Sequence, residues 1–239
     1  MTITFRDPDN GLVRDVTITR AKINLKNVTW AMLPGTTIAH LRIAAFSRGV
    51  TDELQSSLRQ IKSDGASGIV LDLRNNPGGL LDEAVGVASQ FLGSGNVLQV
   101  KDAAGQVRSI PVEPGGLAVD IPLVVLINQG SASASEIVAG ALQDAGRASL
   151  VGETTFGTGT VLNHFGLSDG SELLLATQEW LTPKGRTIWH LGIQPDETVN
   201  LSTDVIPLTP KSEGVMTTAQ LKASSDKQLL KAIEMLLQE

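Results

Sequence analysis

The chain has 239 residues, of which 41% are apolar and 18% charged, and its net charge is −6. This composition is typical of a globular protein large enough to bury a core, and it excludes a wholly disordered chain. Cysteine is absent, which excludes disulfides, thiolate metal sites and a thiol nucleophile. The histidines are few and scattered, so we expect no metal and no cofactor. No basic stripe or long apolar run occurs, so neither nucleic acid nor a membrane span is expected.

The first residues predict a β-hairpin. Alternating strands are expected at 2–5 and 13–19, around the turn-forming residues 7–11. An isolated hairpin is marginally stable in water, so we interpret this one as the trailing edge of a domain whose body is missing. Met1 is followed by neither a basic nor an apolar region, so no signal peptide is predicted in this chain.

Strands and helices then alternate along the chain. The predicted strands are 28–30, 38–43, 68–73, 121–127 and 148–151, and the predicted helices are 51–61, 81–92 and 134–145. The first helix has Leu54, Leu58 and Ile61 on one face and Thr51 as its expected cap. Such alternation predicts an α/β fold with right-handed crossovers.

The last third of the chain is predicted to differ. Residues 160–188 return to β character, with a hairpin turn at Leu167–Gly170. A polar linker is expected at 202–216, followed by an amphipathic helix over 226–238 with Ser225 as its cap.

Two turns that follow predicted buried strands could carry chemistry. The Asn76–Gly79 turn could offer backbone amides to an oxyanion, although two glycines after a strand often form an ordinary turn. The run Ser131–Glu136 joins a strand to a helix, where a serine hydroxyl lies near free amides. At least one of its three serines is expected to be only a helix cap.

Several segments, in this order, resemble the carboxy-terminal processing or tail-specific proteases, the S41 serine peptidases. They are Val70–Leu80, Asn128–Ile137, Gly152–Gly159, Leu167–Ser171, Leu181–Ile188 and Gly192–Asp196. The resemblance covers about residues 36–200. It implies an α/β, ClpP/crotonase-like ββα core at 25–204, a remnant PDZ hairpin at 1–24, and a linker with a C-terminal helix at 205–239.

The resemblance also implies a site. The family uses a Ser–Lys dyad, and its nucleophile corresponds to Ser133. Its oxyanion amides correspond to Gly78, Gly79 and Ala134, and a family Asp on the following helix corresponds to Asp144. The expected substrate is a protein or peptide, and the expected location is extracytoplasmic, in the cell envelope or periplasm.

One position departs from the family pattern. Thr158 stands where the family has its general-base lysine, and Leu162 replaces a family glutamine. A threonine hydroxyl cannot take a proton from serine, because it is no more basic. His164 could act as a substitute base, although a surface histidine is the alternative. Glu136 shares a helix face with Asp144 and is expected to cap or to form a salt bridge.

These residues leave more than one function open. The first hypothesis is an S41-type endopeptidase acting on C-terminal or unfolded segments, impaired or inactive because of Thr158. The second is a non-catalytic pseudoprotease that binds peptides or apolar ligands in the same cleft, as retinoid-binding proteins of the eye carry a similar core without protease work. A third, a crotonase-like acyl-CoA enzyme, is disfavoured because basic residues for the CoA phosphates are missing.

Overall fold

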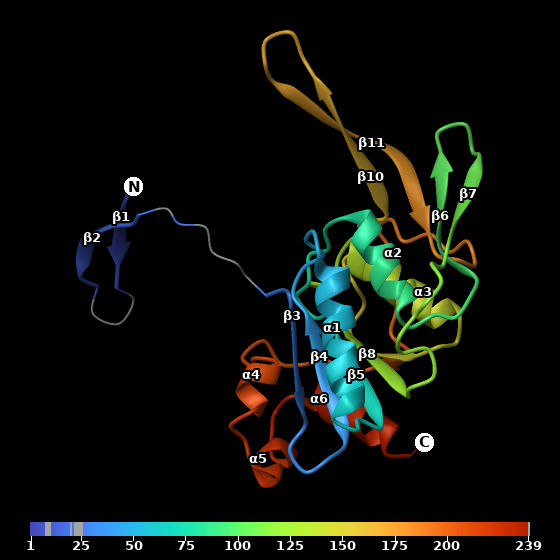
Figure 1. Ribbon diagram of the computed structural model, residues 1–239. Helices are drawn as coiled ribbons and strands as arrows, with labels where there is room; N and C mark the ends of the chain where they lie inside the picture. Colours follow the sequence, from blue (N-terminus) through green and yellow to red (C-terminus); the bar gives the residue numbers. More distant parts are fainter. Residues whose placement is uncertain (8–10, 20, 22–25, 239) are drawn as a thin grey trace.

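The computed structural model describes residues 1–7, 11–19, 21 and 26–238, and a six-stranded sheet forms its centre (Figure 1). The strand order is β12-β9-β8-β5-β4-β3. The strands are β3 (Val28–Met32), β4 (Ile38–Ile43), β5 (Gly68–Asp72), β8 (Leu123–Ile127), β9 (Ser149–Gly152) and β12 (Glu197–Thr198). Neighbouring strands from β4 to β12 are parallel, and only the β3–β4 pair is antiparallel.

Helices cover both faces of this sheet, so its central strands are fully buried. The helices α1 (Val50–Ser63), α2 (Leu81–Ser89) and α3 (Ala134–Asp144) pack on one face, together with Ile69 and Leu71 of β5. Helix α6 (Lys227–Leu236) packs on the other face. Alternate residues of β5 therefore point to two separate apolar clusters, which explains its continuous apolar sequence. The predicted α/β alternation is confirmed.

A second sheet is antiparallel and has the order β10-β11-β6-β7. Its strands are β6 (Asn96–Asp102), β7 (Val107–Pro111), β10 (Thr160–Gly166) and β11 (Glu172–Leu181). The β10–β11 hairpin projects away from the body of the protein (Figure 1). The sequence analysis does not predict β6 and β7, because their residues lack the sustained alternation of a half-buried strand.

The N-terminal hairpin is present, with β1 (Thr2–Arg6) antiparallel to β2 (Val13–Thr17). All of its strand residues are exposed. Of the turn predicted at 7–11, residues 8–10 lie outside the described residues. Its assignment to a PDZ domain stays a prediction.

The C-terminal segment contains more helix than expected. Short helices α4 (Pro210–Glu213) and α5 (Thr218–Lys222) lie in and after the predicted linker. The cap of α6 is Asp226 and not Ser225, because the Asp226 carboxylate accepts the Leu229 amide at 3.1 Å. No helix in the described part of the chain is long and apolar enough to cross a bilayer.

The expected cap of the first helix is also wrong. Helix α1 starts at Val50, with Gly49 at its N-cap position. The Thr51 hydroxyl instead donates to Glu83 of α2 at 2.7 Å. The Thr51 side chain, which the sequence pattern predicts to cap α1, therefore joins α1 to α2 instead.

Candidate active site

Ser133 lies at the junction between β8 and α3, as the N-cap residue of α3. Its φ is 56° and its ψ is −115°, a backbone conformation that L residues rarely adopt. Such a residue costs about 1–3 kcal/mol and persists only where its surroundings fix it. The side chain is half-buried. The sharp turn therefore presents the Ser133 hydroxyl at the carboxyl end of the sheet, where ligands bind in α/β folds.

The structure distinguishes the three serines of this segment. The Ser131 hydroxyl donates to the Leu73 carbonyl at 2.8 Å, and the Ser135 hydroxyl donates to the Asn76 carbonyl at 2.9 Å. Both are buried and tie the segment to the neighbouring loop. The Ser133 hydroxyl donates to no acceptor among the described residues. Only Ser133 therefore has a hydroxyl left for chemistry.

The glycine turn that follows β5 lies directly against Ser133. A Cβ atom added at Gly78 would lie 2.6 Å from the Ala132 carbonyl oxygen and 2.7 Å from the Ser133 Cβ. A Cβ atom at Gly79 would lie 2.3 Å from the carbonyl oxygen of Phe46. Only glycine permits these approaches, and so the sequence of this turn sets how close its backbone comes to Ser133.

Two backbone amides near Ser133 are free to bind an anion. The Gly79 and Ala134 amides donate to no acceptor within the described residues. Ala134 is the first residue of α3, where the helix dipole favours negative charge. The Gly78 amide, in contrast, donates to the Asn76 side-chain oxygen at 2.9 Å. The arrangement leaves the Gly79 and Ala134 amides available to an anion and uses the Gly78 amide to close the turn.

Glu136 connects Ser133 to the loop that carries Thr158. One carboxylate oxygen accepts the Ser133 amide at 2.8 Å and the Thr158 amide at 2.9 Å. The other oxygen accepts the Thr155 hydroxyl and the Gly157 amide, both at 2.6 Å. Glu136 is fully buried, and these four donors compensate for the loss of water around its charge. The expected capping role of Glu136 is therefore only part of what it does.

The cluster around Ser133 lacks a basic side chain. It consists of Ser133, Glu136, Thr155, Gly157 and Thr158, and none of these carries an amine or an imidazole. Thr158 is half-buried. Its side chain carries only a hydroxyl and a methyl group at the position where the family has lysine. None of these hydrogen-bonded residues could therefore take the Ser133 proton.

The structure does not bring His164 to this cluster. His164 lies on the projecting hairpin, where its ring pairs with Glu172 at 3.0 Å and its side chain is 68% exposed. The histidine tied to the loop is His190, whose amide donates to the Gly157 carbonyl at 2.9 Å. Its ring stands 4.1 Å from the Trp189 ring, measured between centroids. The only sequence signal for His190 is its place just after the family segment that ends at Ile188.

Asp144 is also separate from Ser133. It ends α3, whose eleven residues span about 15 Å. Its carboxylate accepts the Lys184 amide at 2.7 Å and pairs with the Arg186 guanidinium at 2.6 Å. Asp144 thus anchors the turn between β11 and the following segment and does not approach the candidate nucleophile.

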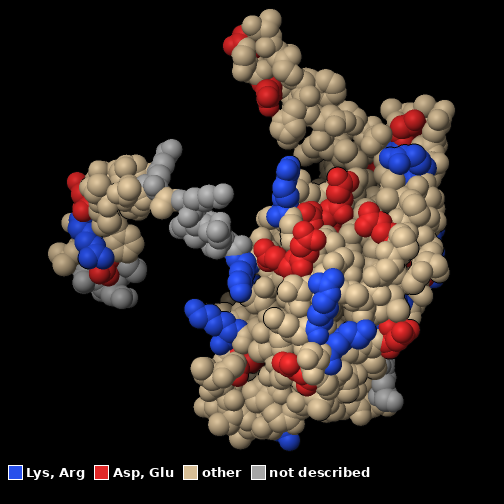
Figure 2. All heavy atoms as spheres, in the orientation of Figure 1, with Lys and Arg blue, Asp and Glu red and all other residues tan. Residues whose placement is uncertain are grey.

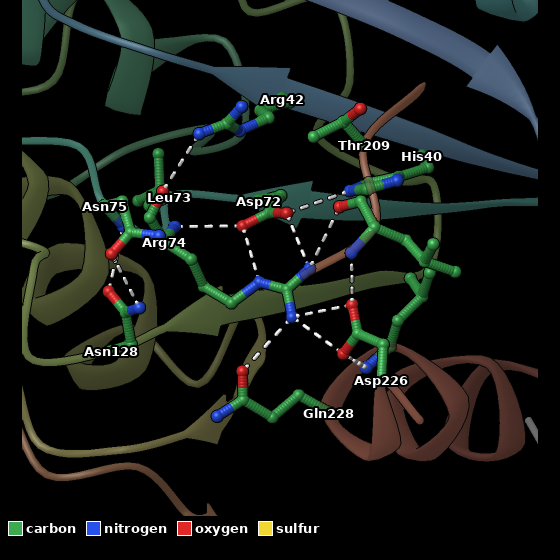
Figure 3. A network of polar contacts seen from close by, with 12 residues as sticks. His40, Arg42, Asp72, Leu73, Arg74, Asn75, Asn128, Thr209, Asp226 and Gln228 are labelled. Carbon is green, nitrogen blue, oxygen red and sulfur yellow. Dashed lines mark hydrogen bonds and ion pairs between the residues drawn. The ribbon is translucent and has the colours of Figure 1, made fainter. Parts of the chain in front are cut away.

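A buried charge network surrounds Arg74, in the loop that follows β5 (Figure 3). The Arg74 guanidinium lies between the carboxylates of Asp72 and Asp226, each at 2.8 Å. Because Asp226 caps α6, this cation links the loop after β5 to the C-terminal helix. All three side chains are buried, so each charge depends on its partners.

His40 extends this network to α4. Its ring nitrogens pair with Asp72 at 3.1 Å and Glu213 at 2.7 Å, and all three side chains are buried. Burial alone would lower the pKa of His40, but its hydrogen bonds to the two carboxylates and their charges raise it to about 9. Burial opposes ionisation of Asp72 as well, yet the Arg74 and His40 contacts hold the pKa of its carboxyl far below its usual value.

Comparison with known proteins places this site in a family. A sequence model of peptidase family S41 matches residues 37–199. The carboxyl-terminal-processing protease of Synechocystis is 42% identical over 189 residues, which covers 78% of this chain and 44% of that protein. The carboxyl-terminal-processing protease of Picosynechococcus is 38% identical over 242 residues, which covers 100% of this chain and 55% of that protein.

A solved structure agrees with the sequence matches. The photosystem II D1 C-terminal processing protease superimposes with a TM-score of 0.73 at 30% identity, over 91% of this chain and 59% of that one. The chain thus spans about half the length of the curated relatives it matches.

Proposed function

Because the chain belongs to peptidase family S41, we propose that it is a serine endopeptidase core for C-terminal or unfolded protein segments, impaired or inactive through Thr158. The observation that carries the proposal is the single Glu136 oxygen that accepts both the Ser133 and Thr158 amides. Because both amides bind the same oxygen, the backbones of residues 133 and 158 lie close together, which supports position 158 as the place of the base.

Each residue then has a role in acyl transfer. The Ser133 oxygen would attack the scissile carbonyl, and the Gly79 and Ala134 amides would stabilise the negative charge that develops on the carbonyl oxygen. Gly78 would join them only by releasing Asn76. Asp144 would act at a distance, by fixing the turn around Arg186. The missing step is removal of the serine proton, for which Thr158 has no basic atom.

A non-catalytic role is the second candidate. The absence of a base beside Ser133 favours a pseudoprotease that binds peptides or apolar ligands in the same cleft. The exposed Leu162 side chain, where the family has glutamine, is consistent with an apolar ligand.

The two candidates are separated by restoring the base. We expect little or no casein degradation by the protein or its Ser133→Ala variant, and a rise of about a hundredfold or more in Thr158→Lys, with or without Leu162→Gln. The matched control is Thr154→Lys, which adds the same amine at an exposed position of the same loop and should change nothing.

The outcomes are distinct. Activity in Thr158→Lys that disappears on adding Ser133→Ala supports the endopeptidase core. Equal inactivity of every variant, with saturable peptide binding, supports the pseudoprotease instead. Cleavage by the unaltered protein that Ser133→Ala abolishes would mean that another base acts, and His190→Gln would then be the first variant to assay.

The same proposal covers the surroundings of the core. We infer that residues 1–24 belong to a PDZ domain and that the protein acts outside the cytoplasm. The support is the family resemblance and the names of the relatives, which are carboxyl-terminal-processing proteases. Cell fractionation with an antibody to this chain tests the location.

A further inference from the structure

The outer edge of β10 is open to another strand. Strand β10 stands at the end of its sheet and pairs only with β11 among the described strands. An edge strand carries unpaired amides and carbonyls, which proteins usually protect with lysine, proline or a covering element. The sequence of β10, Thr160–Gly166, contains neither lysine nor proline. Its residues from Leu162 onward are exposed, and its one irregularity lies near its start, between Val161 and Leu162.

Both faces of the β10–β11 hairpin carry exposed apolar side chains beside a polar pair, His164–Glu172 on one face and Asn163–Thr177 on the other. Phe165 lies opposite Leu173, and Asn163 lies opposite Leu175, so Phe165, Leu173 and Leu175 share one face. On the other face, Leu174 lies opposite His164, and Leu162 lies opposite Ala176. The leucines and the phenylalanine named here are each 44–49% exposed. A solvated antiparallel ribbon normally has one polar face, so this hairpin is built to contact apolar groups.

The charge of the hairpin narrows the choice of partner. Between Thr158 and Ala176 the only acidic residues are Asp169 and Glu172, the only histidine is His164, and there is no Lys or Arg. Figure 2 agrees, because the projecting arm is tan with red patches and no blue along its length. An acidic or phosphate-rich partner would find no Lys or Arg here, whereas a neutral apolar segment needs none.

The position of β10 connects this edge to the candidate active site. The strand starts at Thr160, two residues after Thr158, whose amide shares a Glu136 oxygen with the Ser133 amide. A segment paired along β10 would therefore have one end close to the Ser133 hydroxyl. Beside this end lies a hollow of about 470 Å³, lined by Thr160, Ala176 and Trp189 and also by the charged side chains of Lys101, Asp102 and Glu179. It could receive a side chain of the bound segment.

We propose that the outer edge of β10 binds an extended, predominantly apolar polypeptide segment as an added strand and leads it to Ser133. The proposal rests on the proposed function, in which the bound segment is the substrate. Backbone hydrogen bonds to the edge would supply affinity without sequence specificity, and the apolar faces would select against charged segments. Because the edge tolerates many sequences, it fits an unfolded substrate better than one folded partner.

Binding is tested separately from cleavage, in the Ser133→Ala background. The probe is a fluorescein-labelled peptide of alternating valine and threonine, followed by fluorescence anisotropy, and a second probe carries aspartate in place of valine. We expect saturable binding of the first probe and weaker binding of the second. Adding Leu162→Lys with Phe165→Lys should weaken binding of the first probe on the order of tenfold or more, because the protruding lysines block an incoming strand.

The matched control is Val107→Lys. Val107 is 52% exposed on β7, the opposite edge strand of the same sheet. It should leave the affinity unchanged. Amide hydrogen exchange of the Ser133→Ala protein with the probe bound gives a readout that does not depend on the lysine variants folding. Exchange should slow along 162–166 and stay the same along 107–111.

Each contrary result overturns the proposal. These results are no binding of the first probe, equal loss of affinity in the β10 and β7 variants, or unchanged exchange along β10. Light scattering measures the oligomeric state. A dimer that forms in the Ser133→Ala protein and is lost on adding Leu162→Lys and Phe165→Lys would assign the edge to a second copy of this chain. Binding at β10 without cleavage by Thr158→Lys would refute the peptidase and leave the docking edge intact, so the two failures are distinguishable.

Discussion

Gly78 and Gly49 have nearly the same φ angle but different surroundings. Their φ angles are 95° and 89°. A Cβ at Gly78 would lie 2.6–2.8 Å from atoms of Ala132, Ser133 and Ala134, whereas a Cβ at Gly49 meets nothing within 4 Å. The comparison separates the cost of a left-handed conformation, which both residues share, from the cost of crowding, which only Gly78 has.

We therefore predict that Gly49→Ala lowers the free energy of unfolding by about 1–2 kcal/mol. Gly78→Ala should cost on the order of 2 kcal/mol more, because the loop must move away from Ser133. Urea denaturation of the two variants and the unaltered protein measures both. Equal costs would mean that the turn can shift freely, and then its closeness to Ser133 would not be fixed by packing.

For single residues, the family motifs predict which serine is the candidate nucleophile, and the structure shows which contacts the other serines make. The motifs assign Ser133 by resemblance, but the expectation that one of the other serines only caps the helix is wrong, because the N-cap residue of α3 is Ser133 itself. The sequence leaves open what Ser131 and Ser135 do. The answer depends on the Leu73 and Asn76 carbonyls, which lie far from Ser131 and Ser135 in the sequence. No local pattern contains such contacts, and the same holds for the Asn76 side chain that engages the Gly78 amide.

Among the elements, α3 and the loop before β10 are held together by the carboxylate of Glu136. Its two oxygens accept two donors each, and no cation takes part. The site therefore requires two acceptor oxygens that each face two donors. Glutamine has the same size as glutamate, but its amide NH₂ is a donor and cannot replace one of these oxygens.

We predict that Glu136→Gln lowers the free energy of unfolding by about 2–4 kcal/mol, because an amide NH₂ would face two buried donors. Hydrogen exchange of the Gly157 and Thr158 amides should become faster. The matched control is Glu179→Gln, whose carboxylate pairs with Lys101 at 3.5 Å on the surface and should cost less than about 1 kcal/mol. Unchanged exchange at Gly157 and Thr158 would show that the loop is held by other contacts.

The elements differ in how far the sequence predicts them. Strands β3, β4, β5, β8 and β9 and helices α1 to α3 are confirmed because each buries a continuous or periodic apolar pattern. Strand β12 of the same sheet is missed, because its two residues are exposed and form no pattern. Strands β6 and β7 are missed, since their stability comes from pairing with each other and with β11 and not from their own pattern. Helices α4 and α5 are too short for periodicity, and their threonine caps are the only local signal.

For the whole molecule, the resemblance to S41 peptidases is confirmed by the family match and by the superposition on a solved protease of that kind. The loop around Thr158 is held by contacts that do not involve a lysine side chain. The Gly157 and Thr158 amides donate to Glu136, and the glycine turn packs against Ser133.

The C-terminal segment is joined to the central sheet by buried charges that respond to pH. His40 of β4 pairs with Asp72 of β5 and with Glu213 of α4, and Arg74 completes the group. The pKa of His40 is raised from 6.5 to about 9 in the folded protein. A group whose pKa is higher in the folded than in the unfolded state stabilises the fold fully below its unfolded pKa. That stabilisation is lost as the pH rises through the folded value.

We predict that the free energy of unfolding falls between about pH 6.5 and 9 by an amount on the order of 3 kcal/mol attributable to His40. Urea denaturation across this range measures the fall, and His40→Gln should remove it, because glutamine can hydrogen bond to both carboxylates but does not titrate. His164→Gln is the matched control, since His164 is exposed and pairs with Glu172 outside the network. It should keep the full pH dependence. If the fall persists in His40→Gln or disappears in His164→Gln, the charge on His40 does not hold α4 and the C-terminal helices on the sheet.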